Sequence, residues 1–191
     1  MRINLAVRVA ITGNIASGKS QVEDVIIQQG YAVYDSDKLA HDALNKITDF
    51  YGFDVFTNGK IDRKKLGNLV FSNTDLRKKL EQIIHPIVKE KIFEIFEKHS
   101  NDKFVFVSVP LLYESGFDNI FDKVIFVSVP EKIQLERLMK RNNLTVEEAM
   151  LRIDSQQSQG EKLERADFII KNDSTLDELK LQTINILEKL G

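Results

Sequence analysis

The chain has 191 residues, enough for one α/β domain with an insertion but too few for two large domains. Its formal net charge is −2, from 27 basic and 29 acidic side chains, and this balance argues against a nucleic-acid-binding surface as the main function. Because it contains no cysteine, it can form neither disulfides nor thiolate metal sites. Residues 1–7 lack the pattern of a signal peptide, and no apolar run approaches membrane-spanning length. We therefore expect a soluble, cytoplasmic protein that does not act in a membrane.

The first predicted elements are a buried strand at residues 8–12 and an amphipathic helix at 22–30. Between them, residues 13–20 have the sequence GNIASGKS, which fits the phosphate-loop motif G-x-x-x-x-G-K-[ST]. In this motif backbone N–H groups converge on phosphate oxygens, Lys19 reaches the β- and γ-phosphates, and the Ser20 hydroxyl can ligate Mg²⁺. The sequence therefore predicts binding of a nucleoside triphosphate with Mg²⁺. The residues expected to contact it are Asn14, Ile15, Ala16, Ser17, Gly18, Lys19 and Ser20.

A second short strand is predicted at residues 31–34, followed by two aspartates and a helix that begins near residue 39. Asp35 and Asp37 fall at the carboxyl edge of this strand, the side on which open α/β sheets bind ligands. One carboxylate can accept the proton of an acceptor hydroxyl, and another can help to hold hydrated Mg²⁺. Alternatively, Asp35 caps the following helix, which would leave only one of the two for chemistry.

Residues 45–100 differ in character from the segments around them. They carry apolar residues at helical spacing, with a turn predicted at 58–59 and no candidate strand. Pro86 lies within the apolar stripe, so a kink or a break between two helices is expected there. We predict a helical insertion between two strands of the sheet.

Strand patterns return at residues 104–107 and 124–127, and each of these segments ends in Ser-Val-Pro. A helix is predicted at 131–141, a polar helical or loop stretch at 144–160, a last strand at 166–170 and a closing helix at 176–190. Strands that alternate with helices indicate an α/β fold with a doubly wound parallel sheet of five strands.

Two arginines on the helix at 131–141 are candidates for phosphate binding. Arg137 and Arg141 are four residues apart, so they share one helix face. A guanidinium group binds phosphate through two hydrogen bonds and can stabilise a transferred phosphoryl group. An ordinary solvated basic face, paired with nearby glutamates, explains the same spacing equally well.

Several further segments carry a specific pattern when they are taken together in chain order. They are residues 12–20 (TGNIASGKS), 35–40 (DSDKLA), 62–66 (DRKKL), 85–86 (HP), 110–114 (PLLYE), 137–141 (RLMKR) and 166–172 (ADFIIKN). With these segments the chain resembles the dephospho-CoA kinase family over nearly its full length. The resemblance implies transfer of the ATP γ-phosphate to the ribose 3′-hydroxyl of dephospho-CoA. It also implies a sheet of the P-loop kinase type with a helical substrate-binding insertion and a helical lid. The corresponding parts are a nucleotide core of residues 1–44, 101–136 and 161–191, a substrate insertion of residues 45–100, and a lid of residues 137–160.

The resemblance also assigns roles to individual residues. It implies Asp37 as the catalytic base, with Lys19 and Arg141 as further catalytic residues and Ser20 as the metal ligand. Nucleotide contacts would include Arg137 and Asn172, and the substrate-side candidates are Asp35, Arg63, His85, Leu112, Tyr113 and Glu114. From their chemistry alone His85 suits a structural role, Arg63 a salt bridge, and the leucine core packing. Many family members carry an acidic residue where this chain has Ser108, so the resemblance leaves the metal to Ser20 and to water held by Asp35 or Asp37.

Three further expectations complete the sequence-based interpretation. The other two histidines, His41 and His99, are expected at the surface. The expected partners are ATP and dephospho-CoA, with the protein a monomer or a weak homo-oligomer. The alternatives are another small kinase, such as one acting on a nucleoside monophosphate, and a nucleotide-dependent switch without transferase activity. The switch is disfavoured because the chain lacks the N-K-x-D segment that recognises guanine.

Overall fold

A computed structural model describes residues 6–44, 55–57 and 60–191 of the chain. The chain forms two compact units, one made of Met1–Asp35 with Phe96–Gly191 and the other of Ser36–Ile95. The first unit therefore comes from two separate stretches of sequence, and the second from the single stretch between them.

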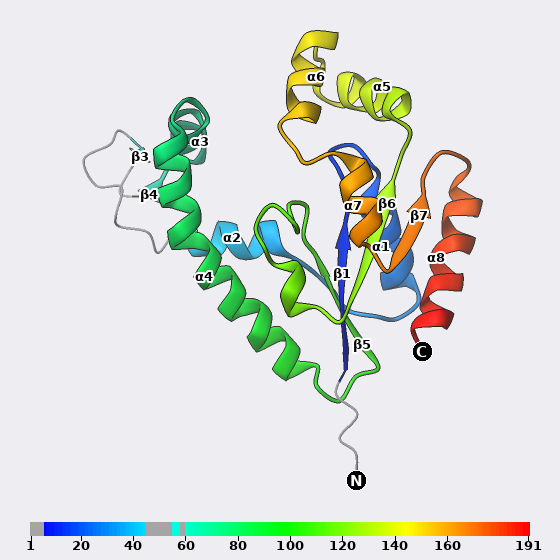
Figure 1. The fold of residues 1–191 in the computed structure, drawn as a ribbon. Coiled ribbons are helices and arrows are strands. Elements are labelled where there is room, and N and C mark those ends of the chain that lie inside the picture. The colour runs from blue at the N-terminus through cyan, green and yellow to red at the C-terminus, as the bar shows by residue number, and fades with distance from the viewer. Residues whose placement is uncertain (1–5, 45–54, 58–59) are drawn as a thin grey trace. The chain divides into compact units, whose positions relative to one another are not determined.

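The first unit is built on a parallel sheet whose strand order is β2-β5-β1-β6-β7 (Figure 1). From β1 the chain places two strands on each side, which is the doubly wound arrangement, and every neighbouring pair is parallel. The strands are almost wholly buried in the middle of the sheet, as expected when helices flank it. The predicted five-stranded parallel sheet is confirmed. The strands are β1 (Val7–Thr12), β2 (Val33–Asp35), β5 (Phe104–Ser108), β6 (Lys123–Ser128) and β7 (Phe168–Lys171).

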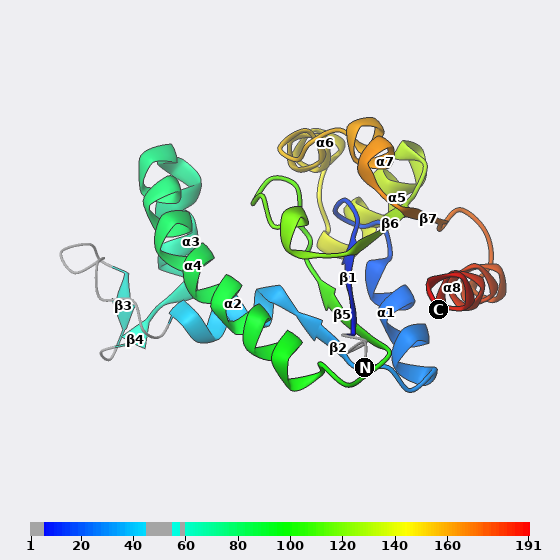
Figure 2. The same ribbon diagram turned by 60° about the horizontal axis from the view of Figure 1, so that its bottom comes forward.

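Helices of the first unit flank this sheet. Helices α1 (Lys19–Gln28) and α8 (Leu176–Leu190) lie side by side, and α7 (Gln159–Arg165) lies against β6 (Figure 2). Between the sheet and the first two helices lies an apolar core that includes Ile11, Ile26, Phe106, Ile125 and Leu187. Each such side chain stabilises the fold by about 1.5–3 kcal/mol when it is fully buried. Two further helices, α5 (Glu131–Asn142) and α6 (Val146–Asp154), pack on each other, and a short 3₁₀ helix spans Asp118–Ile120.

The second unit is mainly helical, but it also contains a small hairpin. Strands β3 (Phe56–Thr57) and β4 (Lys60–Ile61) pair in antiparallel fashion, so the expectation of no strand in this region was wrong. Strands of two residues each carry no alternation that a pattern search could detect. The turn predicted at 58–59 lies outside the described residues. The helices of this unit are α2 (Ser36–Leu44), α3 (Arg63–Ser72) and α4 (Thr74–Lys98), except that the end of α4 from Phe96 onward belongs to the first unit.

Of the two outcomes expected at Pro86, a kink or a break, the break does not occur, because helix α4 continues without interruption through this residue. The kink stays a prediction. Proline removes one backbone donor from the helix, but the remaining bonds of a 25-residue helix stay available. Ile84, Val88 and Ile92 are buried at helical spacing on both sides of the proline. This packing outweighs the local loss of one hydrogen bond.

His99 lies just after α4 and is not the surface residue that the sequence suggested. Its Nε2 is 2.6 Å from the Tyr34 hydroxyl on β2, and its Nδ1 is 2.6 Å from a carboxylate oxygen of Asp102. The His99 side chain is only 14% exposed. The sequence could not show this because Tyr34 and His99 lie far apart along the chain. His41, in contrast, is exposed as predicted.

Candidate active site

The phosphate loop connects β1 to α1 at the carboxyl edge of the sheet. Gly18 has a left-handed backbone, with φ at 87°, and a Cβ at this position would collide with the side-chain amide of Asn172. Both conditions restrict the position to glycine. Helix α1 begins at the next residue, Lys19, so its first backbone N–H groups and the positive end of its dipole face the loop.

Side chains from three other segments hold the backbone of this loop. Gln134 of α5 donates from Nε2 to the Ile15 carbonyl at 2.9 Å, and the Gln156 side-chain oxygen accepts from the Ile15 N–H at 2.7 Å. Asn172, at the end of β7, donates to the Ser17 carbonyl at 2.8 Å. The loop is therefore fixed before any nucleotide binds, which reduces the ordering cost of binding.

Lys162 of α7 is buried beneath the loop, with its side chain 1% exposed. Its Nζ donates to the Asn14 side-chain oxygen at 2.8 Å and to a carboxylate oxygen of Glu114 at 2.7 Å. The same carboxylate oxygen accepts from the backbone N–H of Gln157 at 3.2 Å. Lys162 was not among the predicted site residues, because a lysine on a short polar helix is usually a solvated charge.

Lys19, the lysine of the motif, reaches the carboxyl end of β5. Its Nζ donates to the Ser108 hydroxyl, and it forms an ion pair of 2.7 Å with Glu23, one turn later on α1. The Ser108 hydroxyl in turn donates to the same Glu23 oxygen at 2.6 Å. Glu23 is a second residue that the sequence analysis did not single out.

The two candidate aspartates lie at the junction of β2 and α2. Asp35 is the last residue of β2 and is paired in register with Ser108 of β5. It also directly precedes α2, the position from which a side chain can cap a helix. Asp37 lies in the first turn of α2, where a negative charge is favoured by the helix dipole. The catalytic and capping roles of Asp35 both stay predictions.

The two candidate arginines and the phosphate loop line the same cavity, which has a volume of about 560 Å³. Its walls come from the loop and the start of α1 on one side and from Arg137, Lys140 and Arg141 of α5 on the other. Nη1 of Arg137 is buried and finds no hydrogen-bond partner among the described residues. Neither Arg137 nor Arg141 forms an ion pair with a glutamate among the described residues, although Arg141 is exposed, as the alternative of a solvated basic face expects. A buried, unpartnered guanidinium nitrogen beside a phosphate loop fits an anionic ligand.

The three candidate residues in the segment after β5 differ in burial and in the groups that their side chains contact. Leu112 is fully buried, as core packing would require. Tyr113 is buried with its ring 4.2 Å from the Arg165 guanidinium, and burial raises the pKa of its hydroxyl to about 12. Glu114 uses its carboxylate to bind Lys162. Direct contacts between these three side chains and a substrate stay predictions.

The remaining candidates belong to the second unit. His85 lies within α4, immediately before Pro86, and is half-buried. Arg63 is the first residue of α3, and its side chain lies outside what the structure describes. Their substrate-side roles stay predictions. No cluster of three or more potential metal-binding side chains occurs in the described parts of the chain.

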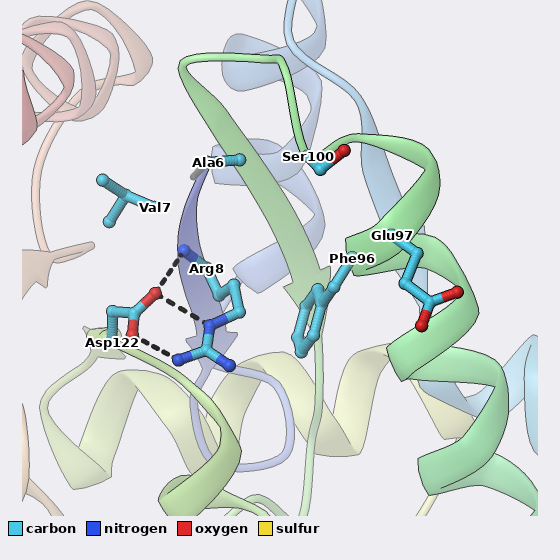
Figure 3. A pocket seen from close by; sticks show the side chains of 7 residues that line it. All are labelled: Ala6, Val7, Arg8, Phe96, Glu97, Ser100 and Asp122. Carbon is cyan, nitrogen blue, oxygen red and sulfur yellow. Dashed lines mark hydrogen bonds and ion pairs between the residues drawn. The ribbon is translucent and has the colours of Figure 1, made fainter. Parts of the chain in front are cut away.

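A second cavity, of about 500 Å³, lies at the opposite end of β1 from the phosphate loop. Figure 3 shows the Arg8 guanidinium there between the Asp122 carboxylate and the ring of Phe96. Two side-chain hydrogen bonds join Arg8 to Asp122, at 2.9 and 2.5 Å, and the Arg8 backbone N–H adds a third at 2.9 Å. Arg8 is already paired with Asp122, and no residue of the phosphate loop lines this cavity, so it is not the candidate nucleotide site. None of the helices that can be described is long and apolar enough for a membrane span.

The parallel sheet, the phosphate loop at its carboxyl edge and the arginines facing that loop define a nucleotide-binding kinase of the P-loop class. Solved structures of shikimate kinases share this fold at low identity, for example one from Aquifex aeolicus with a TM-score of 0.57 and 17% identity. A family model described as dephospho-CoA kinase matches residues 7–178, and the chain belongs to this family.

Individual relatives agree with this assignment. The dephospho-CoA kinase of Bacillus licheniformis is 42% identical over 190 residues, which cover 94% of each chain. That of Geobacillus kaustophilus is 42% identical and covers 97% of each chain. The solved structure of dephospho-CoA kinase from Campylobacter jejuni has a TM-score of 0.74 and 35% identity, with 96% of each chain covered. A Thermus thermophilus structure titled TT1252 has a TM-score of 0.86 and 32% identity.

Proposed function

We propose that this chain transfers the γ-phosphoryl group of ATP to the ribose 3′-hydroxyl of dephospho-CoA, giving CoA and ADP, the last step of coenzyme A biosynthesis. The 3′-oxygen forms the new bond to phosphorus, the bond from phosphorus to the β–γ bridging oxygen breaks, and ADP carries away that oxygen. The single observation that supports this most is the preformed phosphate loop with Lys19 at the strand ends, in a chain of this family.

The loop binds the triphosphate through its backbone N–H groups, and Lys19 leaves Ser108 and Glu23 to meet the β- and γ-phosphates. Phosphoryl transfer needs positioning and electrostatic stabilisation more than covalent help from the protein. The rigid support of the loop by Gln134, Gln156 and Asn172 suits this need, because the donors are held in place before the substrate arrives.

Asp37 takes the proton of the 3′-hydroxyl as the general base, and Asp35 helps to hold the metal-bound water. When Mg²⁺ is bound, it neutralises charge that develops on the phosphate oxygens. Ser20, in the first turn of α1, supplies a hydroxyl ligand beside those phosphates. Ser20 offers a hydroxyl oxygen and Asp35 carboxylate oxygens, and oxygen is the ligand atom that Mg²⁺ prefers.

Arg137 and Arg141 contact the phosphates during transfer and belong to a lid of residues 137–160. The support for this role is the unpartnered Nη1 of Arg137 and the cavity that both arginines share with the loop. Residues 45–100, including Arg63 and His85, bind dephospho-CoA as a substrate insertion.

The test is release of ADP from ATP and Mg²⁺ with dephospho-CoA, compared with AMP, shikimate and pantothenate as acceptors. We expect rapid ADP formation with dephospho-CoA alone, together with formation of CoA. Lys19→Ala should remove this activity while the protein stays folded, because the γ-phosphate loses its charge partner. Turnover of AMP in place of dephospho-CoA would instead support a nucleoside monophosphate kinase. ADP release that no acceptor stimulates would support a nucleotide-dependent switch.

A further inference from the structure

Glu23 places a negative charge where the triphosphate is proposed to bind. It lies one turn after Lys19 on α1, and the phosphate-loop motif ends before it and does not require it. Its carboxylate contacts both Lys19 and the Ser108 hydroxyl at the end of β5. The Lys19 and Glu23 side chains are each only 18% exposed, so water screens this charge weakly.

A carboxylate beside bound phosphates is repelled by them unless a cation lies between. In the structure that cation is the Lys19 ammonium group. In the proposed function Lys19 moves to the phosphates. The Glu23 carboxylate then loses its ion pair and keeps only its hydrogen bond from the Ser108 hydroxyl, of the two contacts described above. A partly buried carboxylate without a cation is unfavourable, so a second cation is needed on this side of the site.

The donors around Glu23 suit hydrated Mg²⁺. Mg²⁺ usually keeps several water molecules and is held by one or two carboxylates together with substrate phosphates. Asp35 is the register partner of Ser108 on the neighbouring strand, so two carboxylates belong to the same strand-end region. Ser20 precedes Glu23 by three residues, which places both on one side of α1. All four residues belong to the first unit and offer oxygen atoms.

We propose that Glu23 is a positioning residue of the transfer site, whose carboxylate holds a water molecule of the hydrated Mg²⁺ that enters with ATP. The inference rests on the proposed function and adds a residue to it. Helix α1 then serves the site three times, through Lys19 on the phosphates, Ser20 on the metal and Glu23 on the metal-bound water.

A simpler role for Glu23 is to hold Lys19 in place until nucleotide arrives. The two roles predict opposite effects of removing the charge. If Glu23 only competes with the phosphates for Lys19, Glu23→Gln strengthens nucleotide binding equally with and without Mg²⁺. If Glu23 orders metal-bound water, the variant loses specifically the part of the affinity that depends on Mg²⁺.

The experiment measures the affinity for a non-hydrolysable ATP analogue by calorimetry, once with Mg²⁺ and once with EDTA. We expect the ratio of the two affinities to fall about tenfold to a hundredfold in Glu23→Gln, the usual cost of losing a group that orients a metal ligand. The affinity in EDTA should stay equal or rise, because Lys19 is released. Asp24→Asn is the matched control, because Asp24 is the adjacent residue on α1 and is exposed. It should keep the wild-type ratio.

A second variant restores the charge from the neighbouring strand. Ser108 Oγ lies 2.6 Å from the Glu23 carboxylate, so Ser108→Asp in the Glu23→Gln background returns a carboxylate to the same region. We expect this double variant to recover most of the wild-type ratio between the affinity for the analogue with Mg²⁺ and the affinity in EDTA. A wild-type ratio in Glu23→Gln would overturn the proposal. Should that variant not fold, a folded double variant with a strongly reduced ratio would overturn it instead.

These outcomes are separate from a failure of the proposed function, because the binding measurement contains no dephospho-CoA. A wild-type protein that does not phosphorylate dephospho-CoA, but whose Mg²⁺ ratio depends on Glu23, would refute the proposed substrate and keep the role of Glu23. Normal turnover of dephospho-CoA with a ratio that does not depend on Glu23 would refute the role alone.

Discussion

Asp35 and Asp37 are two residues apart, yet they end one element and begin another. Asp35 closes β2 and is fixed by pairing with β5, whereas Asp37 belongs to the first turn of α2. Because α2 begins at Ser36, the two carboxylates also fall in different compact units of the chain. Because one aspartate ends a strand and the other begins a helix, we expect the two to have different roles in the reaction.

We predict that Asp37→Asn lowers kcat roughly a hundredfold or more and leaves ATP binding largely intact, as expected for loss of a general base. Asn keeps the size of the side chain but cannot accept the proton. Steady-state kinetics with dephospho-CoA, combined with nucleotide titration, measure both effects. Asp35→Asn is the comparison and should lower kcat less. An active Asp37→Asn with an inactive Asp35→Asn would reverse the two roles.

The pairing of Arg8 with Asp122 should make stability depend on pH. Hydrogen bonds from the Arg8 guanidinium hold the pKa of the Asp122 carboxyl below its usual range. A carboxyl whose pKa is lowered by folding stabilises the protein above its unfolded pKa of about 3.9, and this contribution is lost as the pH falls through the folded value. Both side chains are more than a third exposed, so screening limits the contribution to about 1 kcal/mol.

Asp122→Asn should therefore lower the free energy of unfolding by about 1 kcal/mol at pH 7, with the difference from wild type shrinking below about pH 4. Urea denaturation at several pH values measures this. Asp173→Asn, which removes an exposed carboxylate after β7, is the control and should have little effect. A difference that stays constant down to pH 3 would show that the charge on Asp122 is not the cause.

Among the elements, the phosphate loop is supported mainly by the segment that runs from α6 into α7. Gln156 binds the Ile15 N–H, Gln157 accepts from Asn14, and Lys162 joins Asn14 to Glu114. The loop and this segment are far apart in sequence, and no local pattern connects them. A displacement of α7 would therefore reach the phosphate loop directly.

Lys162→Met should destabilise the protein by about 2–3 kcal/mol, because it leaves Glu114 without its cation. This is less than the about 3–5 kcal/mol of a fully buried pair, since the Glu114 side chain is 21% exposed and can take up water. Urea denaturation gives the stability, and nucleotide titration should show weaker binding because Asn14 loses a partner. Lys180→Met, an exposed lysine on α8, is the control. Equal stability of the Lys162 and Lys180 variants would contradict this account.

The parts of the fold that were predicted correctly are those with a strong local pattern. The apolar runs at 104–107 and 124–127 indicated buried strands, and the glycines and lysine of GNIASGKS indicated the loop. The residues that were missed act over long separations: Glu23 through Ser108, Lys162 through Asn14, and His99 through Tyr34. Their side chains are polar and follow no periodicity, so only the folded chain shows what they contact.

For the molecule as a whole, bound nucleotide should appear as added stability. A ligand at a hundred times its Kd stabilises the folded state by about 2.7 kcal/mol. In a chain of this size each kcal/mol moves the Tm by about 2–4 °C, so we expect a rise of roughly 5–10 °C. Calorimetry of the intact chain with a non-hydrolysable ATP analogue and Mg²⁺ measures it.

The chain has two compact units, so the thermogram need not be a single two-state transition. The shift is expected in the transition of the unit that carries the loop. Lys19→Ala should reduce it, whereas an analogue that left the wild-type Tm unchanged would contradict the nucleotide site.

The central strand β1 pairs with β5, Val7 lying opposite Phe104, although the whole of the second unit is encoded between them. During synthesis on the ribosome, β1 therefore leaves the exit tunnel long before the strand it needs. At ordinary translation rates the delay is roughly 5–20 seconds. Through that interval the nascent chain holds unpaired a strand whose last four residues are buried in the folded sheet, and the sheet can assemble only after β5 and β6 have been made. Folding of this protein in the cell is then timed by translation of the stretch between its two halves, and that waiting period is when β1 is most exposed to aggregation or to capture by a chaperone.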